Sequence, residues 1–236
     1  MLRPLALLMT VSALGLSACG ESSGDDVTPP PSAPAASTPA TPETAPPAEE
    51  PSADASCVKS EEPGGEKALP CPTQTVEEGK TNVVSLETSE GDFDITLDVE
   101  RAPETANSVA YLAKEGFYDG LDFHRVVPDF VIQGGDPNGD GSGGPGYSVT
   151  EAPPSDLTYT RGLVAMAKAG NEPAGASGSQ FFVVSAPDVG LPPEYALVGK
   201  VDAAGMKIVD KITALGEGDG PPSKKVTIEK ATFSAE

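Results

Sequence analysis

Residues 92–99 of this chain alternate strictly between polar and apolar side chains. The apolar members are Phe93, Ile95, Leu97 and Val99. Because successive side chains of a β-strand point to opposite faces, the alternation predicts a strand with one face buried. Residues 82–88, which precede it across the turn sequence Ser-Glu-Gly, are predicted to be its hairpin partner.

The sequence that follows, residues 103–233, favours further short strands and two helices. Further strands are predicted at residues 131–133, 162–167, 180–185, 196–201 and 225–233. A helix is predicted from Pro103, which suits a first turn because it lacks an N–H, to a stop at Gly116. A second helix is predicted over residues 204–215. Many short strands separated by turn signals favour an antiparallel barrel or sandwich.

Residues 1–19 have the features of a bacterial export signal. Arg3 precedes an apolar stretch at residues 5–14 that is too short to span a membrane. The following Leu-Ser-Ala-Cys resembles the lipobox of bacterial lipoproteins, in which the cysteine is acylated and becomes the mature N-terminus. We therefore expect residues 1–18 to be a signal peptide and Cys19 to be lipidated. An ordinary signal cleaved near Ala18 is the alternative.

The segment that follows the signal, residues 19–56, is rich in proline and nearly free of apolar side chains larger than alanine. Such a segment cannot bury enough surface to offset the entropy of ordering it. We expect a disordered tether that holds a folded domain on the outer face of a bacterial cell membrane. A proline-rich ligand for another protein is the alternative.

The cysteines and the charge limit the chemistry further. With Cys19 acylated, Cys57 and Cys71 remain as an even pair in an N-terminal extension, residues 57–80, and we favour a structural disulfide over two free thiols. One histidine and three cysteines nearly exclude a zinc cluster. A formal charge of −21 argues against nucleic acid as a partner and mildly favours a monomer.

Three sequence segments carry a family resemblance. They are F-H-R-V-V-P-D-F-V-I-Q-G-G-D at residues 123–136, continuing into the glycine-rich 141–147; G-L-V-A-M-A-K-A at 162–169; and S-G-S-Q-F-F-V-V at 177–184. In this order and spacing they resemble the cyclophilin family of peptidyl-prolyl cis-trans isomerases. For residues 81–236 the resemblance implies an eight-stranded antiparallel β-barrel closed by two α-helices. It also implies a cofactor-free isomerase that acts on proline-containing polypeptides, here in exported proteins.

The resemblance also assigns roles to individual residues. Arg125 matches the catalytic arginine of the family, and Gln133 matches a polar group beside it. The residues matched to the binding of the proline ring and its rim are Phe130, Val131, Phe182, Leu191 and Tyr195. Those matched to contacts with the substrate backbone and its flanks are Gly141, Ala167, Lys168, Ala169 and Gln180. The usual rim tryptophan is replaced by Gly190, so we expect weak cyclosporin binding.

Each of these residues also has a structural interpretation. Arg125 taken alone is typical of a surface ion pair, and Phe130 and Phe182 are typical of a core. His124, the one histidine, is predicted to be a buried, hydrogen-bonded structural residue, because no G-x-S-x-G motif accompanies it. The glycines after Gln133 lack the G-K-[ST] of a phosphate-binding loop and are expected in turns.

The sequence leaves two functions from different classes open. The first is the isomerase. The alternative is a proline-peptide-binding or chaperone module with incidental turnover, and Arg125 favours the enzyme because a module that only binds could dispense with it. A secreted hydrolase is disfavoured, since the chain shows neither a catalytic triad nor a metal site.

Overall fold

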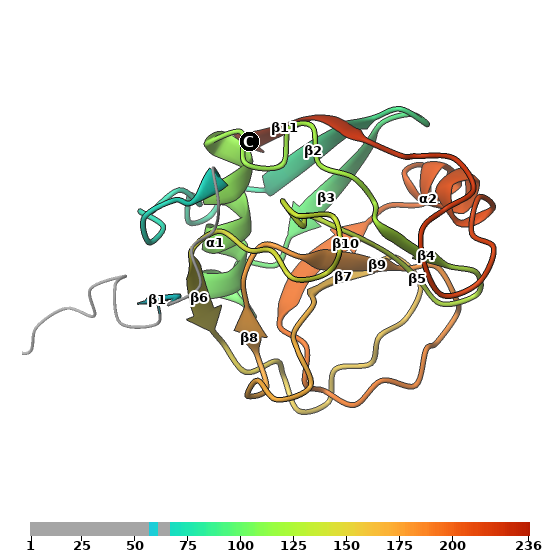
Figure 1. Ribbon diagram of the computed structural model, residues 1–236. Helices are drawn as coiled ribbons and strands as arrows, with labels where there is room; N and C mark the ends of the chain where they lie inside the picture. The colour runs from blue at the N-terminus through green and yellow to red at the C-terminus, as the bar shows by residue number, and fades with distance from the viewer. Residues whose placement is uncertain (1–56, 61–66) are drawn as a thin grey trace, which may run out of the picture. The chain divides into compact units, whose positions relative to one another are not determined.

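The computed structural model describes residues 57–60 and 67–236, which lie in the unit Ala48–Glu236. The expected signal peptide, Cys19 and the tether fall outside the described residues. Eight strands form one antiparallel sheet in the order β11-β2-β3-β10-β7-β9-β5-β4 (Figure 1). These strands are β2 (Asn82–Thr88), β3 (Phe93–Leu97), β4 (Arg125–Val127), β5 (Val131–Gly134), β7 (Leu163–Met166), β9 (Phe181–Val184), β10 (Leu197–Val201) and β11 (Ile228–Ala235).

The large sheet curls until its two edge strands meet. The residues just before β4 bond to those at the start of β11: the Phe123 N–H donates to the Val226 carbonyl at 2.9 Å, and the Ile228 N–H donates to the Leu121 carbonyl at 2.7 Å. An isolated antiparallel bridge joins Asp122 and Thr227 between them. The expected eight-stranded antiparallel barrel is therefore confirmed. Closure removes the exposed edges that an open sheet would present.

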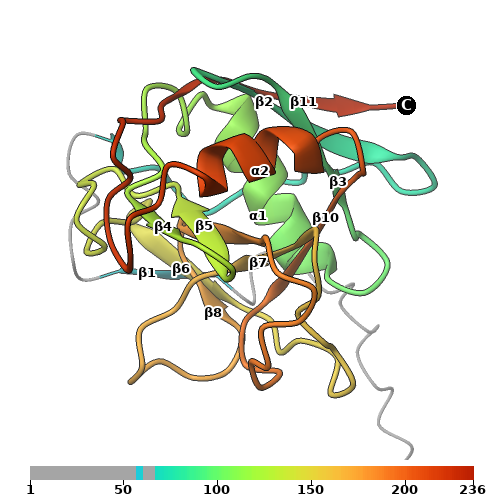
Figure 2. The same cartoon turned by 90° about the vertical axis from the view of Figure 1, so that its right-hand side faces the viewer.

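Two helices pack on this sheet, as the sequence predicted. The first, α1 (Pro103–Lys114), begins at the predicted proline and packs against β2, β10 and β11, while α2 (Met206–Thr213) packs against β4 and β5 (Figure 2). The carboxylate of Glu151 accepts the Thr105 N–H at 2.8 Å at the N-terminus of α1. A negative charge there satisfies free N–H groups and complements the helix dipole.

A second, three-stranded sheet was not predicted. It consists of β1 (Cys57–Lys59), β6 (Tyr147–Thr150) and β8 (Ala176–Ser177), with β6 in the middle. A disulfide joins Cys57 and Cys71, whose Cα atoms are 6.0 Å apart. These strands are two to four residues long, too short for a periodic pattern to reveal them.

The strands β5, β7, β9 and β10 are buried on both faces. Alternate residues fill the barrel interior; they include Ile132, Val164, Met166, Phe181, Val183 and Val198. The residues between them form a second apolar cluster on the outer face; they include Val131, Ala165, Phe182, Val184 and Leu197. This explains why the sequences of β7 and β9 are runs of apolar residues without alternation. Within the described ranges, no helix is long and apolar enough to cross a membrane.

We predict that Gly135 is required for the close packing after β5. Its φ is +83°, and a Cβ there would lie 2.5 Å from the Ser179 carbonyl oxygen and 3.1 Å from the rings of Tyr118 and Phe181. Gly139 has a similar φ of +71° but no atom within 4 Å of that position. Gly139→Ala should therefore show the left-handed backbone penalty alone, about 1–2 kcal/mol. Gly135→Ala should add overpacking of about 1–3 kcal/mol.

Urea denaturation of both variants measures this difference. Equal losses in the free energy of unfolding would show that the chain beside Ser179 relaxes freely, contrary to the prediction.

Candidate functional site

Strand register brings three of the predicted site residues into one row across the sheet. Arg125 on β4 lies opposite Gln133 on β5, and Gln133 lies opposite Phe182 on β9. Phe182 in turn lies opposite Ala165 on β7. Directly paired residues share one face of a sheet, so these side chains form a polar-to-apolar row on the outside of the barrel.

The guanidinium of Arg125 is held on three sides. Its Nη1 donates to Gln133 Oε1 at 3.1 Å, and its Nε and Nη2 donate to the two carboxylate oxygens of Asp219 at 2.5 and 2.9 Å. The guanidinium carbon lies 5.8 Å from the centre of the Phe130 ring. These bonds use three of the five N–H groups of arginine, so a ligand can accept from the other two.

The ion pair between Arg125 and Asp219 is partly exposed, and each partner stabilises the charged form of the other. The Arg125 side chain is 30% exposed and that of Asp219 is 65% exposed. The hydrogen bonds to Asp219 raise the pKa of Arg125, and the same bonds lower the pKa of the Asp219 carboxyl. At this exposure the bidentate pair fixes the orientation of the guanidinium more than it stabilises the fold.

Two amide side chains extend the polar row away from Arg125. Gln133 Nε2 donates to Gln180 Oε1 at 3.1 Å, and Gln180 Nε2 donates to the carbonyls of Gly141 and Gly143 at 2.9 and 3.0 Å. Since the two glycine carbonyls can only accept, they fix the orientation of both amides. The arginine is therefore positioned by a chain of bonds that ends in the backbone.

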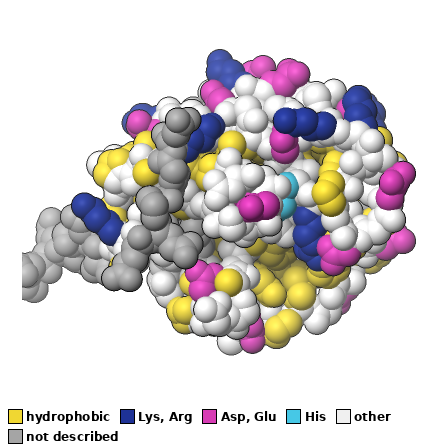
Figure 3. Space-filling model, in the orientation of Figure 1, with side chains coloured by type: hydrophobic (Ala, Val, Ile, Leu, Met, Phe, Trp, Pro, Cys, Tyr) yellow, Lys and Arg dark blue, Asp and Glu magenta, His cyan; other side chains and the backbone are white. Residues whose placement is uncertain are grey.

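Aromatic rings form the apolar end of the row. The rings of Phe182 and Tyr195 meet edge to face with centroids 5.5 Å apart, and Tyr159 lies 6.2 and 5.9 Å from them. The Tyr159 hydroxyl donates to the Tyr195 carbonyl at 2.7 Å and accepts its N–H at 3.0 Å. Burial raises the pKa of Tyr159. Val131, Phe130 and Leu191 belong to this same apolar cluster, and Figure 3 shows apolar side chains gathered in a hollow on this face.

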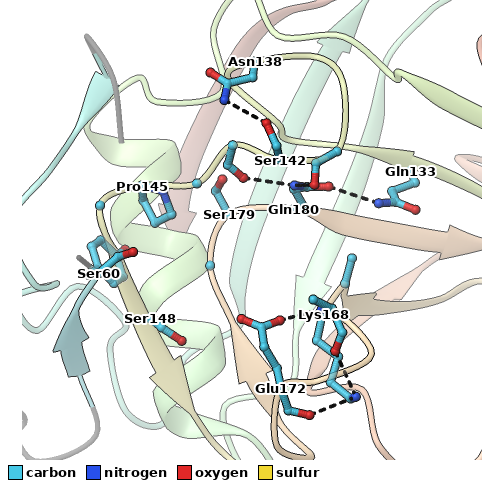
Figure 4. Close-up of a pocket in the computed structure, with 18 residues that line it drawn as sticks. Ser60, Gln133, Asn138, Ser142, Pro145, Ser148, Lys168, Glu172, Ser179 and Gln180 are labelled. Atoms are coloured by element: carbon cyan, nitrogen blue, oxygen red, sulfur yellow. Dashed lines mark hydrogen bonds between the residues drawn. The ribbon is translucent and has the colours of Figure 1, made fainter. Parts of the chain in front are cut away.

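A polar cavity of about 670 Å³ adjoins the row at Gln133 and Gln180 (Figure 4). It holds the remaining predicted residues Gly141, Ala167, Lys168 and Ala169. Ser60, Asn138, Ser142, Ser148, Glu172 and Ser179 are further lining residues. The structure thus places the predicted residues in two adjoining parts: an aromatic groove with Arg125 and a polar cavity.

Lys168 ties two loops together instead of reaching solvent. Its side chain is 5% exposed, and its ammonium lies 3.5 Å from the Glu194 carboxylate and 5.7 Å from the centre of the Tyr195 ring. It also donates to the Glu172 carbonyl at 3.2 Å. Lys168 therefore supports the loops on either side of the cavity.

The expectation for His124 was wrong in part. His124 is half-buried, its Nδ1 has no hydrogen-bond partner among the described residues, and burial lowers its pKa. The carboxylate of Asp136 accepts the N–H groups of Asn138, Asp140 and Gly141 and thereby shapes the loop that follows β5.

Two functional candidates were not predicted from the sequence. Asp219 lies in a Gly-Asp-Gly turn far from Arg125 in the sequence, and Tyr159 lies in a loop without periodicity. No local pattern marks either of them, since each acquires its role through a contact across the fold. In the described part of the chain, no three His, Cys, Asp or Glu side chains are grouped as a metal site requires.

Comparisons with known proteins agree with this geometry. The family model described as "Cyclophilin type peptidyl-prolyl cis-trans isomerase/CLD" matches residues 83–233. The chain is 38% identical over 158 residues to a Helicobacter pylori protein named peptidyl-prolyl cis-trans isomerase, covering 66% of this chain and 89% of that protein. It is 39% identical over 164 residues to a Mycobacterium leprae protein named probable peptidyl-prolyl cis-trans isomerase B, covering 61% and 54%.

The match to the mycobacterial relatives therefore covers about half of their length. Among solved structures, the chain resembles a Cryptosporidium parvum cyclophilin-type peptidyl-prolyl cis-trans isomerase crystallised in the presence of the dipeptide Ala-Pro. The TM-score is 0.59 and the identity 28%, over 65% of this chain and 99% of that one.

We predict that Asp219 restricts the motion of the Arg125 guanidinium. Asp219→Asn removes the charge and one of the two acceptor oxygens, so the order parameter of the Arg125 Nε–H bond should fall. Asp210→Asn is the matched control, because Asp210 accepts from Arg161 Nη2 at 2.7 Å in a similarly exposed pair away from the groove. NMR relaxation of the arginine Nε groups measures both. An unchanged order parameter would mean that Gln133 and Phe130 restrict the guanidinium without Asp219.

The ion pair between Arg125 and Asp219 should weaken at acidic pH. Because the pKa of Asp219 in the folded chain lies below its usual value, the contribution of the pair is complete above the unfolded pKa. It is lost as the pH falls through the lower, folded pKa. In wild type, the Arg125 Nε–H resonance should therefore shift only in this acidic range, and the Asp219→Asn variant should show no such step.

Proposed function

Because the chain belongs to the cyclophilin-type peptidyl-prolyl cis-trans isomerase family, we propose that it accelerates rotation about X-Pro peptide bonds in exported proteins and assists their folding outside the cytoplasm. The observation that carries the proposal is the guanidinium of Arg125 beside the apolar surface of Phe130, Val131 and Phe182. Two of its N–H groups have no partner among the described residues. Rotation about a C–N bond breaks no covalent bond, so the reaction requires no nucleophile, metal or cofactor.

The groove suits the electronic change that accompanies rotation. A planar amide is stabilised by delocalisation of the nitrogen lone pair, and the barrier of about 18–20 kcal/mol reflects its loss on twisting. In the twisted amide the nitrogen becomes a hydrogen-bond acceptor. An N–H of Arg125 that donates to it stabilises the twisted form more than the planar one, which is the condition for catalysis. The apolar cluster holds the proline ring and excludes water.

These groups are sufficient in magnitude. Uncatalysed isomerisation takes tens to hundreds of seconds, about 0.01 s⁻¹. Reaching a turnover of ~10 s⁻¹ is a thousandfold acceleration, about 4 kcal/mol. A hydrogen bond from a charged group contributes about 1.5–3 kcal/mol, and exclusion of water from the aromatic groove strengthens it further.

Substrate choice follows from what the groove contacts. The aromatic cluster receives a proline ring and the flanking residues Ala167 and Ala169 carry only methyl side chains. We therefore propose broad tolerance for the side chain that precedes the proline. Weak cyclosporin binding is proposed as well, because Gly190 leaves the rim without a tryptophan, and a calorimetric titration measures it directly.

The location of the protein is proposed from its N-terminal sequence. The export signal and the lipobox cysteine Cys19 favour a mature chain anchored on the outer face of a bacterial cell membrane, with residues 19–56 as a tether. The disulfide between Cys57 and Cys71 supports this, because structural disulfides persist in oxidising compartments.

We predict that Arg125→Ala separates turnover from binding. Loss of a charge-assisted bond of about 1.5–3 kcal/mol corresponds to a roughly 10- to 150-fold lower rate. Affinity for the peptide should change much less, because the apolar groove remains. NMR exchange spectroscopy on an X-Pro peptide measures both, and Arg101→Ala is a control, since Arg101 pairs with Asp98 outside the groove. A wild type that binds the peptide without accelerating its isomerisation would contradict the proposal and favour a binding module.

We predict that Cys19 carries the lipid anchor. Cells that express the full chain and receive an alkyne-tagged palmitate should label wild type and the Cys57→Ser/Cys71→Ser variant, but not Cys19→Ser. Labelling depends on Cys19 because its thiol and new amino terminus are the acylated groups of a lipoprotein. An unlabelled wild type would indicate an ordinary cleaved signal instead.

A further inference from the structure

One wall of the polar cavity comes from a segment outside the part of the chain that the family model matches. The match begins at residue 83, whereas Ser60 lines the cavity from the N-terminal extension. Figure 4 shows Ser60 beside Pro145, across the cavity from Lys168 and Glu172. The extension therefore contributes surface to the region that adjoins Gln133 and Gln180.

The extension is joined to the cavity wall by backbone hydrogen bonds. Strand β1 pairs with β6, with Cys57 opposite Val149 and Lys59 opposite Tyr147. Beyond the strand, the Ser60 N–H donates to the Gly146 carbonyl at 3.0 Å, and the Leu69 N–H donates to the Pro145 carbonyl at 2.8 Å. Both N–H donors lie in the loop that the disulfide closes, Ser60 soon after Cys57 and Leu69 just before Cys71.

Side chains support part of this wall: Gln180 Nε2 donates to the Gly141 and Gly143 carbonyls, and the buried Tyr147 hydroxyl lies 3.0 Å from Ser108 Oγ. Its partners along the backbone are fewer. The second neighbour of β6 is β8, which pairs only with Val149 and Thr150. Tyr147 and Ser148 therefore have their strand partners in β1 alone. The residues before them, 141–146, are Gly-Ser-Gly-Gly-Pro-Gly, a sequence that loses much conformational freedom when it is ordered. The Pro145 and Gly146 carbonyls accept the Leu69 and Ser60 N–H groups, so the extension is one partner that holds this segment in shape.

The extension can serve as that partner because it is fixed to the body of the domain. The disulfide ties Cys57 to Cys71, and the Lys67 ammonium donates to the carbonyls of Phe117 and Asp119 at 2.8 and 2.7 Å. Farther along, the buried Asn107 side chain of α1 accepts the N–H groups of Thr75 and Val76 at 2.7 and 3.1 Å.

We propose that the extension, residues 57–60 and 67–76, is a positioning element of the peptide-binding site. It holds residues 143–148, which form one wall of the cavity, so that the cavity receives the polypeptide on one side of the X-Pro bond. The lining is rich in hydroxyl and amide groups, which suits the backbone and polar side chains of an extended chain. The inference rests on the proposed function and adds a substrate class to it: extended polypeptides are preferred over short prolyl peptides.

The experiment compares two substrates with the full chain. One is a tetrapeptide that can occupy only the groove, and the other is a twelve-residue peptide with the proline near its centre. NMR exchange and lineshape measurements give kcat/KM for each, and the ratio of the long to the short peptide is the readout. A general loss of stability lowers both values together, so the ratio isolates the cavity.

Two variants alter the wall in different ways, and a third is the control. Cys57→Ser/Cys71→Ser frees the extension, and Ser60→Trp fills the cavity from the residue that follows β1. Both should lower the ratio at least fivefold, through a higher KM for the long peptide. Val58→Trp places the same ring on β1 at a side chain that is 67% exposed and does not line the cavity, so the ratio should stay at the wild-type value.

The outcomes separate the two proposals. A wild type that fails to accelerate even the tetrapeptide overturns the proposed function. A wild type that accelerates both peptides, with a ratio that neither variant changes, overturns the role of the extension and leaves the isomerase intact.

Discussion

The pairing of β5 with β9 in a single register is the constraint on which the site depends. Gln133 lies opposite Phe182 in that register and Arg125 lies opposite Gln133, so the cation, the amide and the aromatic surface form one row. A slip by one residue would turn every side chain of β5 to the other face. Such a slip is strongly opposed, because Ile132 must fill the barrel while Val131 must join the outer cluster. Burial of both faces therefore fixes the geometry of the groove.

Most of the barrel could be predicted from local patterns. The alternation at 92–99 predicted β3, apolar runs predicted β7 and β9, and the proline and glycine at either end of α1 marked its limits. These elements are long or strongly patterned, so the physics that forms them is visible in a few adjacent residues. The site residues between Arg125 and Gln180 followed from a family resemblance and not from periodicity. Their grouping depends on register, which no single strand reveals.

The parts that were missed depend on contacts between distant segments. Asp219 meets Arg125 across 94 positions of sequence, and Lys67 meets Asp119 across 52. Strand β1 is three residues long and exists because β6 offers it an edge. The hydrogen bond expected for His124 is absent at Nδ1 among the described residues, which also depends on how the fold places distant groups. Local sequence specifies which groups can bond, whereas the fold decides which of them meet.

The ion pair between Arg125 and Asp219 also decides which kind of stabilisation the groove can give. In a planar amide the carbonyl oxygen carries the most negative charge, and twisting returns electron density to the nitrogen. An isolated cation near the oxygen would therefore favour the planar ground state, which slows rotation. A guanidinium already paired with a carboxylate has a weak field at a distance but keeps two N–H groups that act on contact. For a reaction that redistributes charge without creating any, a directed hydrogen bond at the nitrogen is the more selective form of stabilisation. In the function proposed above, the pair with Asp219 suits Arg125 to that role.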